Sequence, residues 1–394
     1  MKLRTIYFGI LFIVSLCFIR CTEPFKLVTQ SFQDALVVEA TITNELKHQE
    51  IKLSRTYALE SENQDLETNA NVRIEDSNNN IYNFHETQSG VYLSNEEFQA
   101  VEGVSYQLMI STTDGKQYSS NKEYLPPKVD IEKVYTELVT KDGEEGIQVL
   151  VDSKAGSGDA NFFRYEYEEA YKIVAPAYSP YDMVFSNVTN DGLSYTIDFV
   201  LKPEDVSVCY GINNSTNIIL TSSNSSTENK VSSFPLRFIP IDDSRIRERY
   251  GILVKQYVQS AEAYNFYKVL RDLGTDASVL VDNQPGFVQG NMFSQQDPNE
   301  KVIGFFDVSS VAISKRLYFN YQDFELDPPP YFYDCNYLEL NTVEPRSAST
   351  LYDQVQYGGL KFYSYSNGIY TIVSRNCGDC TAFASKIRPE FWED

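Results

Sequence analysis

The stretch Val104-Ser105-Tyr106-Gln107-Leu108-Met109-Ile110 decides the fold class of this chain. Its apolar residues recur at every second position, so that Tyr106, Leu108 and Ile110 share one face of a β-strand. The turn signal Asp114-Gly115 follows, and a partner strand is predicted around Tyr118. The stretch therefore predicts paired strands with one buried face.

Similar short segments precede it. About seven short strands within about 90 residues, separated by turn clusters, are typical of an immunoglobulin-like β-sandwich. We place this domain at residues 36–127, because Pro126-Pro127 then interrupts the pattern. The upstream strands are predicted at 36–42, 51–53, 70–74, 81–84 and 91–93.

Residues 128–394 are predicted to form a larger β-rich C-terminal domain, so the fold class is mainly β. One amphipathic helix is expected near 261–273, where apolar residues such as Phe266 and Leu270 recur at a spacing of three to four. Ser260 can cap this helix and Gly274 can end it.

The N-terminus has the layout of a lipoprotein signal. Two cations, Lys2 and Arg4, precede an apolar run over 6–19, and Cys21 ends that run. The run is shorter than the roughly 20 residues of a membrane span. We therefore predict a signal peptide over residues 1–20 and lipidation of Cys21.

A polar tether over 21–35 would then carry the folded protein. The alternatives are an ordinary signal peptide and a short membrane anchor. Cys17 is the competing acceptor for the lipid, and Cys21 is preferred because it closes the apolar run.

The charge of the chain argues against nucleic acid as a partner. Its formal net charge is −22, and cleavage before Cys21 would remove three cations and no acid, which gives about −25. Such a surface repels phosphate backbones and anionic lipids. A lipid, not a basic patch, would therefore hold the protein to a membrane.

Histidine-based chemistry is nearly excluded by composition. His48 and His85 are the two histidines, and neither lies in an HExxH or HxH spacing. The chain has no GxSxG elbow and no Gly-rich phosphate loop. We therefore predict no catalytic residue, no metal site and no cofactor, while a hydrolase with two carboxylates remains an alternative.

Four cysteines remain after the signal, and an even number in an exported chain predicts disulfides. Three pairings are possible. The Cys377-Gly378-Asp379-Cys380 motif could instead be redox-active or bind zinc, but no βαβ pattern surrounds it. The disulfide candidates are Cys209, Cys335, Cys377 and Cys380.

Aromatic residues concentrate near the C-terminus, and aromatic side chains are frequent at binding faces. The candidates for partner or ligand contact are Tyr331, Tyr333, Tyr363 and Tyr365. Strand alternation predicts that Tyr363 and Tyr365 share one face.

Several segments together resemble a known family. The quoted segments are Cys21-Thr22-Glu23-Pro24, 36–44, 51–56, 106–118, Pro285, Gly290-Asn291, Gly304-Phe305-Phe306, the CxxC at 377–380 and Pro389-Glu390-Phe391-Trp392. In order and spacing they resemble the Bacteroidota lipoprotein family known as domain of unknown function 4249, over essentially the whole mature chain.

The resemblance implies an outer-membrane lipoprotein that is usually encoded near a TonB-dependent receptor. It implies no catalytic residue. We therefore expect a lipid-anchored accessory or binding subunit that works with a TonB-dependent-receptor-like barrel in nutrient capture. The alternatives are a structural subunit of an outer-membrane assembly or secretion complex and, third, a surface hydrolase. The leaflet stays open, because only Glu23 follows Cys21 as an acid.

Overall fold

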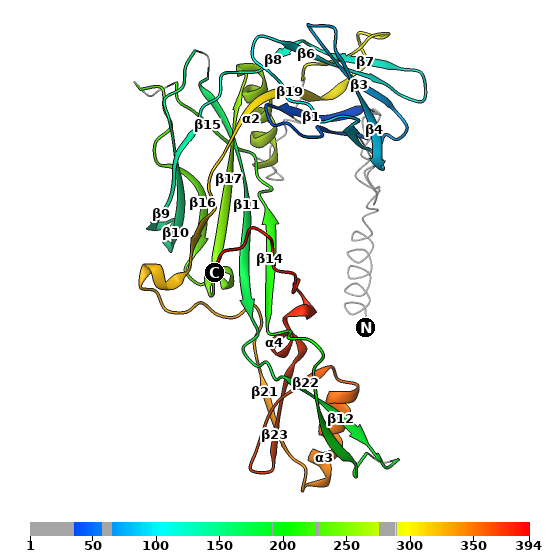
Figure 1. Ribbon diagram of the computed structural model, residues 1–394, viewed down its shortest axis with the longest axis vertical. Coiled ribbons are helices and arrows are strands. Elements are labelled where there is room, and N and C mark those ends of the chain that lie inside the picture. Colours follow the sequence, from blue (N-terminus) through cyan, green and yellow to red (C-terminus); the bar gives the residue numbers. More distant parts are fainter. Residues whose placement is uncertain are drawn as a thin grey trace, which may run out of the picture.

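The computed structural model shows a mainly β protein with three parts along one long axis (Figure 1). An N-terminal body lies at one end, a central body of long strands follows, and a small distal module lies at the other end. Cys21, the signal peptide and nearly all of the predicted tether lie outside the described residues. The structure describes residues 35–56, 65–158, 160–190, 192–224, 228–275, 288 and 290–394.

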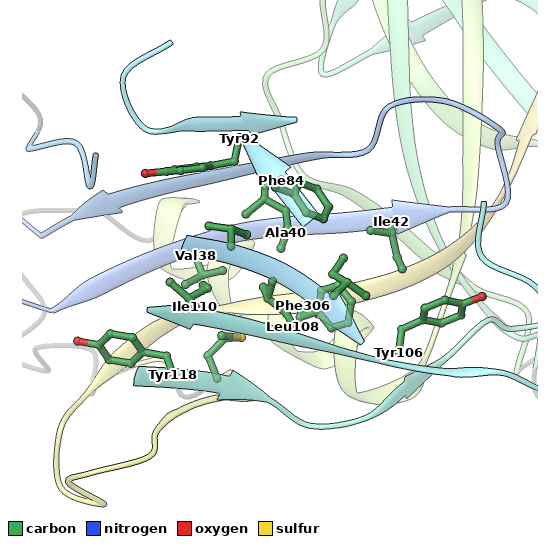
Figure 2. Close-up of a cluster of buried hydrophobic side chains, with 14 of the residues drawn as sticks. Val38, Ala40, Ile42, Phe84, Tyr92, Tyr106, Leu108, Ile110, Tyr118 and Phe306 are labelled. Atoms are coloured by element: carbon green, nitrogen blue, oxygen red, sulfur yellow. The ribbon is translucent and has the colours of Figure 1, made fainter. Parts of the chain in front are cut away.

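The strands predicted before residue 127 are present in the N-terminal body. Their alternation buries one face, as in β6 (Ser105–Ser111), where Tyr106, Leu108 and Ile110 are all almost fully buried. Figure 2 shows these side chains in one cluster with Val38 and Phe306. The strands are β1 (Leu36–Thr43), β2 (Glu50–Arg55), β3 (Asn71–Asp76), β4 (Ile81–Gln88), β5 (Val91–Ser94), β6 (Ser105–Ser111), β7 (Gln117–Ser120) and β8 (Glu123–Tyr124).

A strand from the second half of the chain joins this body to the rest. The first part of β19 (Val302–Ile313) pairs in parallel with β1, and its last four residues pair with β17 (Tyr250–Gln259). β18 (Met292–Ser294) also pairs with β7 at the far edge. Sheet pairing therefore continues beyond the proline pair at 126–127, and β19 contributes Phe306 to the N-terminal core.

The central body consists of two facing groups of strands. One is a three-stranded sheet, and the other belongs to the large sheet around β11 (Phe162–Val174) and β17. Buried residues such as Val149, Phe163 and Ile252 fill the space between them. The strands are β9 (Ile131–Lys141), β10 (Glu144–Ser153) and β16 (Phe234–Pro240) on one side, and β11 (Phe162–Val174), β14 (Val208–Asn214), β15 (Ile219–Ser222), β17 and β20 (Leu317–Phe319) on the other.

The predicted amphipathic helix is confirmed as α2 (Ala261–Thr275). Ser260 caps it, since its hydroxyl accepts a hydrogen bond from the Ala263 amide at 3.1 Å. Phe266 is buried against Phe305 of β19. The helix therefore covers the place where β19 passes between the two bodies.

The expectation of a single helix is wrong, because the distal module contains a second one. α3 (Pro345–Gln356) places Ala348, Leu351 and Val355 at helical spacing, and it buries Ala348 and Leu351. Every helix of the described residues is too short or too polar to cross a membrane. The module consists of β12 (Tyr181–Ser186), β13 (Thr196–Leu201), β21 (Tyr337–Asn341), α3 (Pro345–Gln356), β22 (Leu360–Ser366) and β23 (Ile369–Ser374), and α4 (Arg375–Gly378) follows.

Candidate functional site

A cleft of about 740 Å³ lies where the N-terminal body meets the central body. We call it the junction cleft. One wall is the outer face of β1 and β2, because strand alternation directs Val38 and Ala40 into the core and leaves Glu39 and Thr41 on the cleft side. The other wall comes from β11, β17, α2 and β19, and includes Arg164, Glu166, Tyr257, Phe266, Tyr267, Leu270 and Phe305.

Arg164 is the charged centre of the second wall. It lies opposite Tyr257 in the β11–β17 register, and its guanidinium is 4.2 Å from the Tyr257 ring centroid and 5.0 Å from that of Tyr267. Arg164 pairs with Glu166, which also accepts a hydrogen bond from the Tyr257 hydroxyl at 2.8 Å. Burial alone would raise the pKa of Glu166, but Arg164 and this hydrogen bond outweigh it and lower the pKa.

Deeper in the junction lies a second carboxyl group. Asp307 is 1% exposed, and its Oδ2 accepts hydrogen bonds from Gln259 at 2.6 Å and from Ser309 at 2.8 Å. Burial raises the pKa of Asp307, although the charge of Arg164 acts in the opposite direction. Asp307 Oδ1, Gln259 Oε1 and Arg164 Nε are buried without a hydrogen-bond partner among the described residues. Hydrogen-bonding capacity therefore remains unused behind the cleft.

A second cavity, of about 560 Å³, also borders Phe266 and Phe305. Its most perturbed group is Glu123, whose pKa rises to about 7 because of burial and of repulsion from Asp307 and Glu262. Asn291 donates a hydrogen bond to Glu123 at 2.8 Å. The same amide bonds the backbone of Phe306, accepting from its N–H at 2.8 Å and donating to its carbonyl at 2.9 Å.

Two of the segments that carried the family resemblance meet at this point. Gly290 and Gly304 lie in direct contact, since a Cβ on Gly290 would be 1.6 Å from the Gly304 carbonyl oxygen. Gly304 has a φ of +129°, and a Cβ there would be 2.0 Å from the carbonyl oxygen of Val38. Gly304 therefore permits the close approach of β19 to β1, and Gly290 permits the approach of the segment before β18 to β19.

The four cysteines predicted as disulfide partners form two disulfides. Cys209 of β14 pairs with Cys380, and Cys335 pairs with Cys377. The two halves of the CxxC motif thus bind different segments of the chain. Together they fasten the C-terminal region both to the central body and to the loop that precedes β21.

The four predicted contact tyrosines do not form one patch. Tyr331 and Tyr363 are half-buried around the Cys335–Cys377 disulfide. Tyr333 is 41% exposed beside Phe383, and Tyr365 is 52% exposed beside Tyr370. A register shift after Phe362 interrupts the strict alternation predicted for Tyr363 and Tyr365.

The distal module carries many exposed apolar side chains. Its β12–β13 hairpin rests on the β22–β23 sheet through the Phe199 and Phe362 rings, 4.8 Å apart, yet keeps much apolar surface in solvent. Exposed apolar side chains mark an interaction site where they form a contiguous patch. The exposed residues include Tyr181, Val184, Phe199, Val200, Leu201, Tyr337, Val343, Tyr357 and Tyr365.

Arg164 and the junction cleft were not predicted from the sequence. The sequence does contain a pattern that indicates this site. In one long strand, three charged residues alternate with three aromatic ones: Arg164, Glu166 and Glu168 with Phe163, Tyr165 and Tyr167. Charges in a strand that has neighbours on both sides require buried partners. Within the described ranges, no group of three or more His, Cys, Asp or Glu side chains is arranged to hold a metal ion.

Comparison with known proteins identifies the family of the chain. No curated protein matches the chain. The sequence profile described as "Domain of unknown function (DUF4249)" matches residues 22–315. The match is shorter than the whole mature chain that the resemblance suggested, and leaves Cys335, Cys377 and Cys380 outside it. Because it covers well over half of the residues, the chain belongs to the domain of unknown function 4249 family.

Proposed function

We propose that this protein is a lipid-anchored, non-enzymatic subunit of the outer membrane that docks on a TonB-dependent-receptor-like barrel and assists nutrient capture. The observation that carries the proposal is the exposed aromatic and apolar surface of the distal module. Aromatic side chains that are solvent-exposed on a folded scaffold are the usual anchors of protein–protein interfaces. In this proposal Cys21 bears the lipid, and neither leaflet of the outer membrane is assigned.

The elongated form supports a division of labour between the parts. The distal module lies far from the N-terminal body along the long axis (Figure 1). We propose that the N-terminal body is an immunoglobulin-like sandwich that acts as a rigid spacer near the lipid. The distal module would then be free to reach the partner. The proposed contact residues are Tyr363 and Tyr365 of this module, with Tyr331 and Tyr333 of the loop that precedes β21.

Purification under native detergent conditions tests the proposal. The protein should recover a barrel in stoichiometric amount. Tyr333→Ala and Tyr365→Ala should weaken recovery with little change in melting temperature, because both side chains are about half exposed. Tyr331→Ala and Tyr363→Ala should also lower stability, since both rings pack around a disulfide. Full recovery with all four variants would place the contact elsewhere.

A structural subunit of an assembly or secretion complex is the second candidate. It is favoured by the same exposed surface, which would serve a permanent neighbour equally well. A ligand screen by thermal shift separates the two, because a ligand that binds only the folded state raises the melting temperature. Stoichiometric recovery of a barrel without any stabilising ligand would favour the structural role.

A further inference from the structure

We propose that the junction cleft binds a neutral, hydroxyl-rich ligand, and that this ligand is an oligosaccharide. The inference deepens the capture role proposed above and rests on it. The cleft volume of about 740 Å³ is within the range of small-molecule sites, roughly 300–1,000 Å³. Its walls come from two different bodies, which is a frequent location for such sites.

The charged side chains of the cleft are balanced in number, and within the described part of the chain all of them except the exposed Glu39 are paired. The lining has as many acidic as basic side chains. Arg164 pairs with Glu166, Lys52 with Glu50 at 3.2 Å, and Lys47 with Glu45 at 2.6 Å. An anionic ligand would have to break one of these pairs or remain uncompensated, which costs free energy, and a cationic ligand would find only the exposed Glu39. A neutral ligand avoids that cost.

Paired charges suit hydroxyl groups in particular. A hydroxyl donates one hydrogen bond and accepts others, so that it can bond a carboxylate and a neighbouring cation at once. Arg164 and Glu166 present such a donor and acceptor side by side on one strand. Arg164 is 11% exposed and lines the cleft, and its Nε has no hydrogen-bond partner among the described residues. A polar ligand group in the cleft would meet the part of this guanidinium that remains exposed, since Nε itself is shielded from solvent.

The cleft also has an apolar side. Phe266 and Leu270 of α2 and Ile303 of β19 line it next to the polar pairs. Sugars present apolar C–H faces together with hydroxyl edges, and this wall matches both kinds of surface. A small charged metabolite or a long hydrocarbon chain would match only one of them.

Equilibrium binding to the detergent-solubilised full-length protein tests the inference. The probes are neutral hexasaccharides of glucose, xylose, mannose and galactose, with hexagalacturonate and a lysine-rich hexapeptide as charged comparisons. At least one neutral probe should bind, and Leu270→Trp should weaken its binding by about tenfold or more by filling the cleft. Val269→Trp is the matched control, since Val269 lies on the same helix but borders the second cavity.

Glu39→Trp, on the exposed opposite wall, replaces Leu270→Trp if the latter fails to fold. Three results would overturn the inference: no binding of any neutral probe, binding of the charged probes alone, or equal binding by the cleft variant and the control. Recovery of the barrel is measured in parallel. A recovered barrel without sugar binding removes the cleft inference alone, and sugar binding without a barrel removes the docking proposal alone.

Discussion

At the scale of single residues, Glu123 couples the fold to pH. Burial and repulsion from Asp307 and Glu262 raise its pKa from 4.5 to about 7. Below pH 4.5 the carboxyl is protonated in both the folded and the unfolded state, so its raised pKa does not lower the free energy of unfolding. As the pH rises toward 7 only the unfolded state ionises freely, and folding stability falls by about 2 kcal/mol after allowance for partial exposure.

The variant Glu123→Gln should therefore become more stable than the wild type as the pH rises from 4.5 to 8. The difference in free energy of unfolding, measured by urea denaturation at each pH, should grow by about 2 kcal/mol. Glu97→Gln removes an exposed acid of the same body and serves as control. A pH-independent difference for Glu123→Gln would show that Glu123 ionises normally in the folded protein.

Gly304 is a position where one added carbon atom should strongly destabilise the folded protein. Gly304→Ala would set a Cβ 2.0 Å from the Val38 carbonyl oxygen at a φ of +129°. We expect a loss of about 3 kcal/mol or more in the free energy of unfolding, because β19 must move away from β1. Gly115→Ala has a φ of +86° but no atom within 4 Å, and should cost about 1 kcal/mol. Equal losses in urea denaturation would mean that strain, not contact, dominates.

At the scale of elements, the strands and the helix that have a clear local sequence pattern were predicted correctly. β1 to β7 follow from period-two apolar residues between turn clusters, and α2 follows from its cap and its apolar face. The parallel pairing of β1 with β19 is between residues far apart in sequence, so no local pattern encodes its register. The junction cleft depends on that pairing and was therefore not predictable. α3 was missed although Ala348, Leu351 and Val355 recur at helical spacing, because the weak helix formers Ser, Thr and Asp stand between them.

The pairing of the four cysteines in the two disulfides can be tested directly. Non-reducing peptide mass spectrometry should find Cys209 joined to Cys380 and Cys335 joined to Cys377. Replacing Cys335 and Cys377 by Ser should lower the free energy of unfolding by about 3–4 kcal/mol, given their separation of 42 residues. Four free thiols in protein taken from the cell envelope, or a crossed pairing, would contradict this arrangement.

At the scale of the whole molecule, the family match and the structure divide the chain differently. The match ends at residue 315, whereas the distal module combines 181–201 from inside the match with 337–374 from outside it. The junction cleft is built entirely from residues inside the match. The cleft is therefore a feature we expect family members to share, whereas the exposed surface of the distal module lies partly inside the match and partly outside it.

The lipid anchor would determine where this elongated molecule works. Lys2 and Arg4, the short apolar run and Cys21 predict acylation of Cys21, and a lipidated cysteine with several chains suffices for stable membrane attachment. Cys21→Ala should move the protein from the membrane pellet to the soluble fraction and abolish its labelling with a radioactive fatty acid. Cys17→Ala, which removes the competing cysteine, should change neither result. A Cys21→Ala protein that stays in the membrane, with a wild type that takes up no label, would show that the apolar segment itself is the anchor.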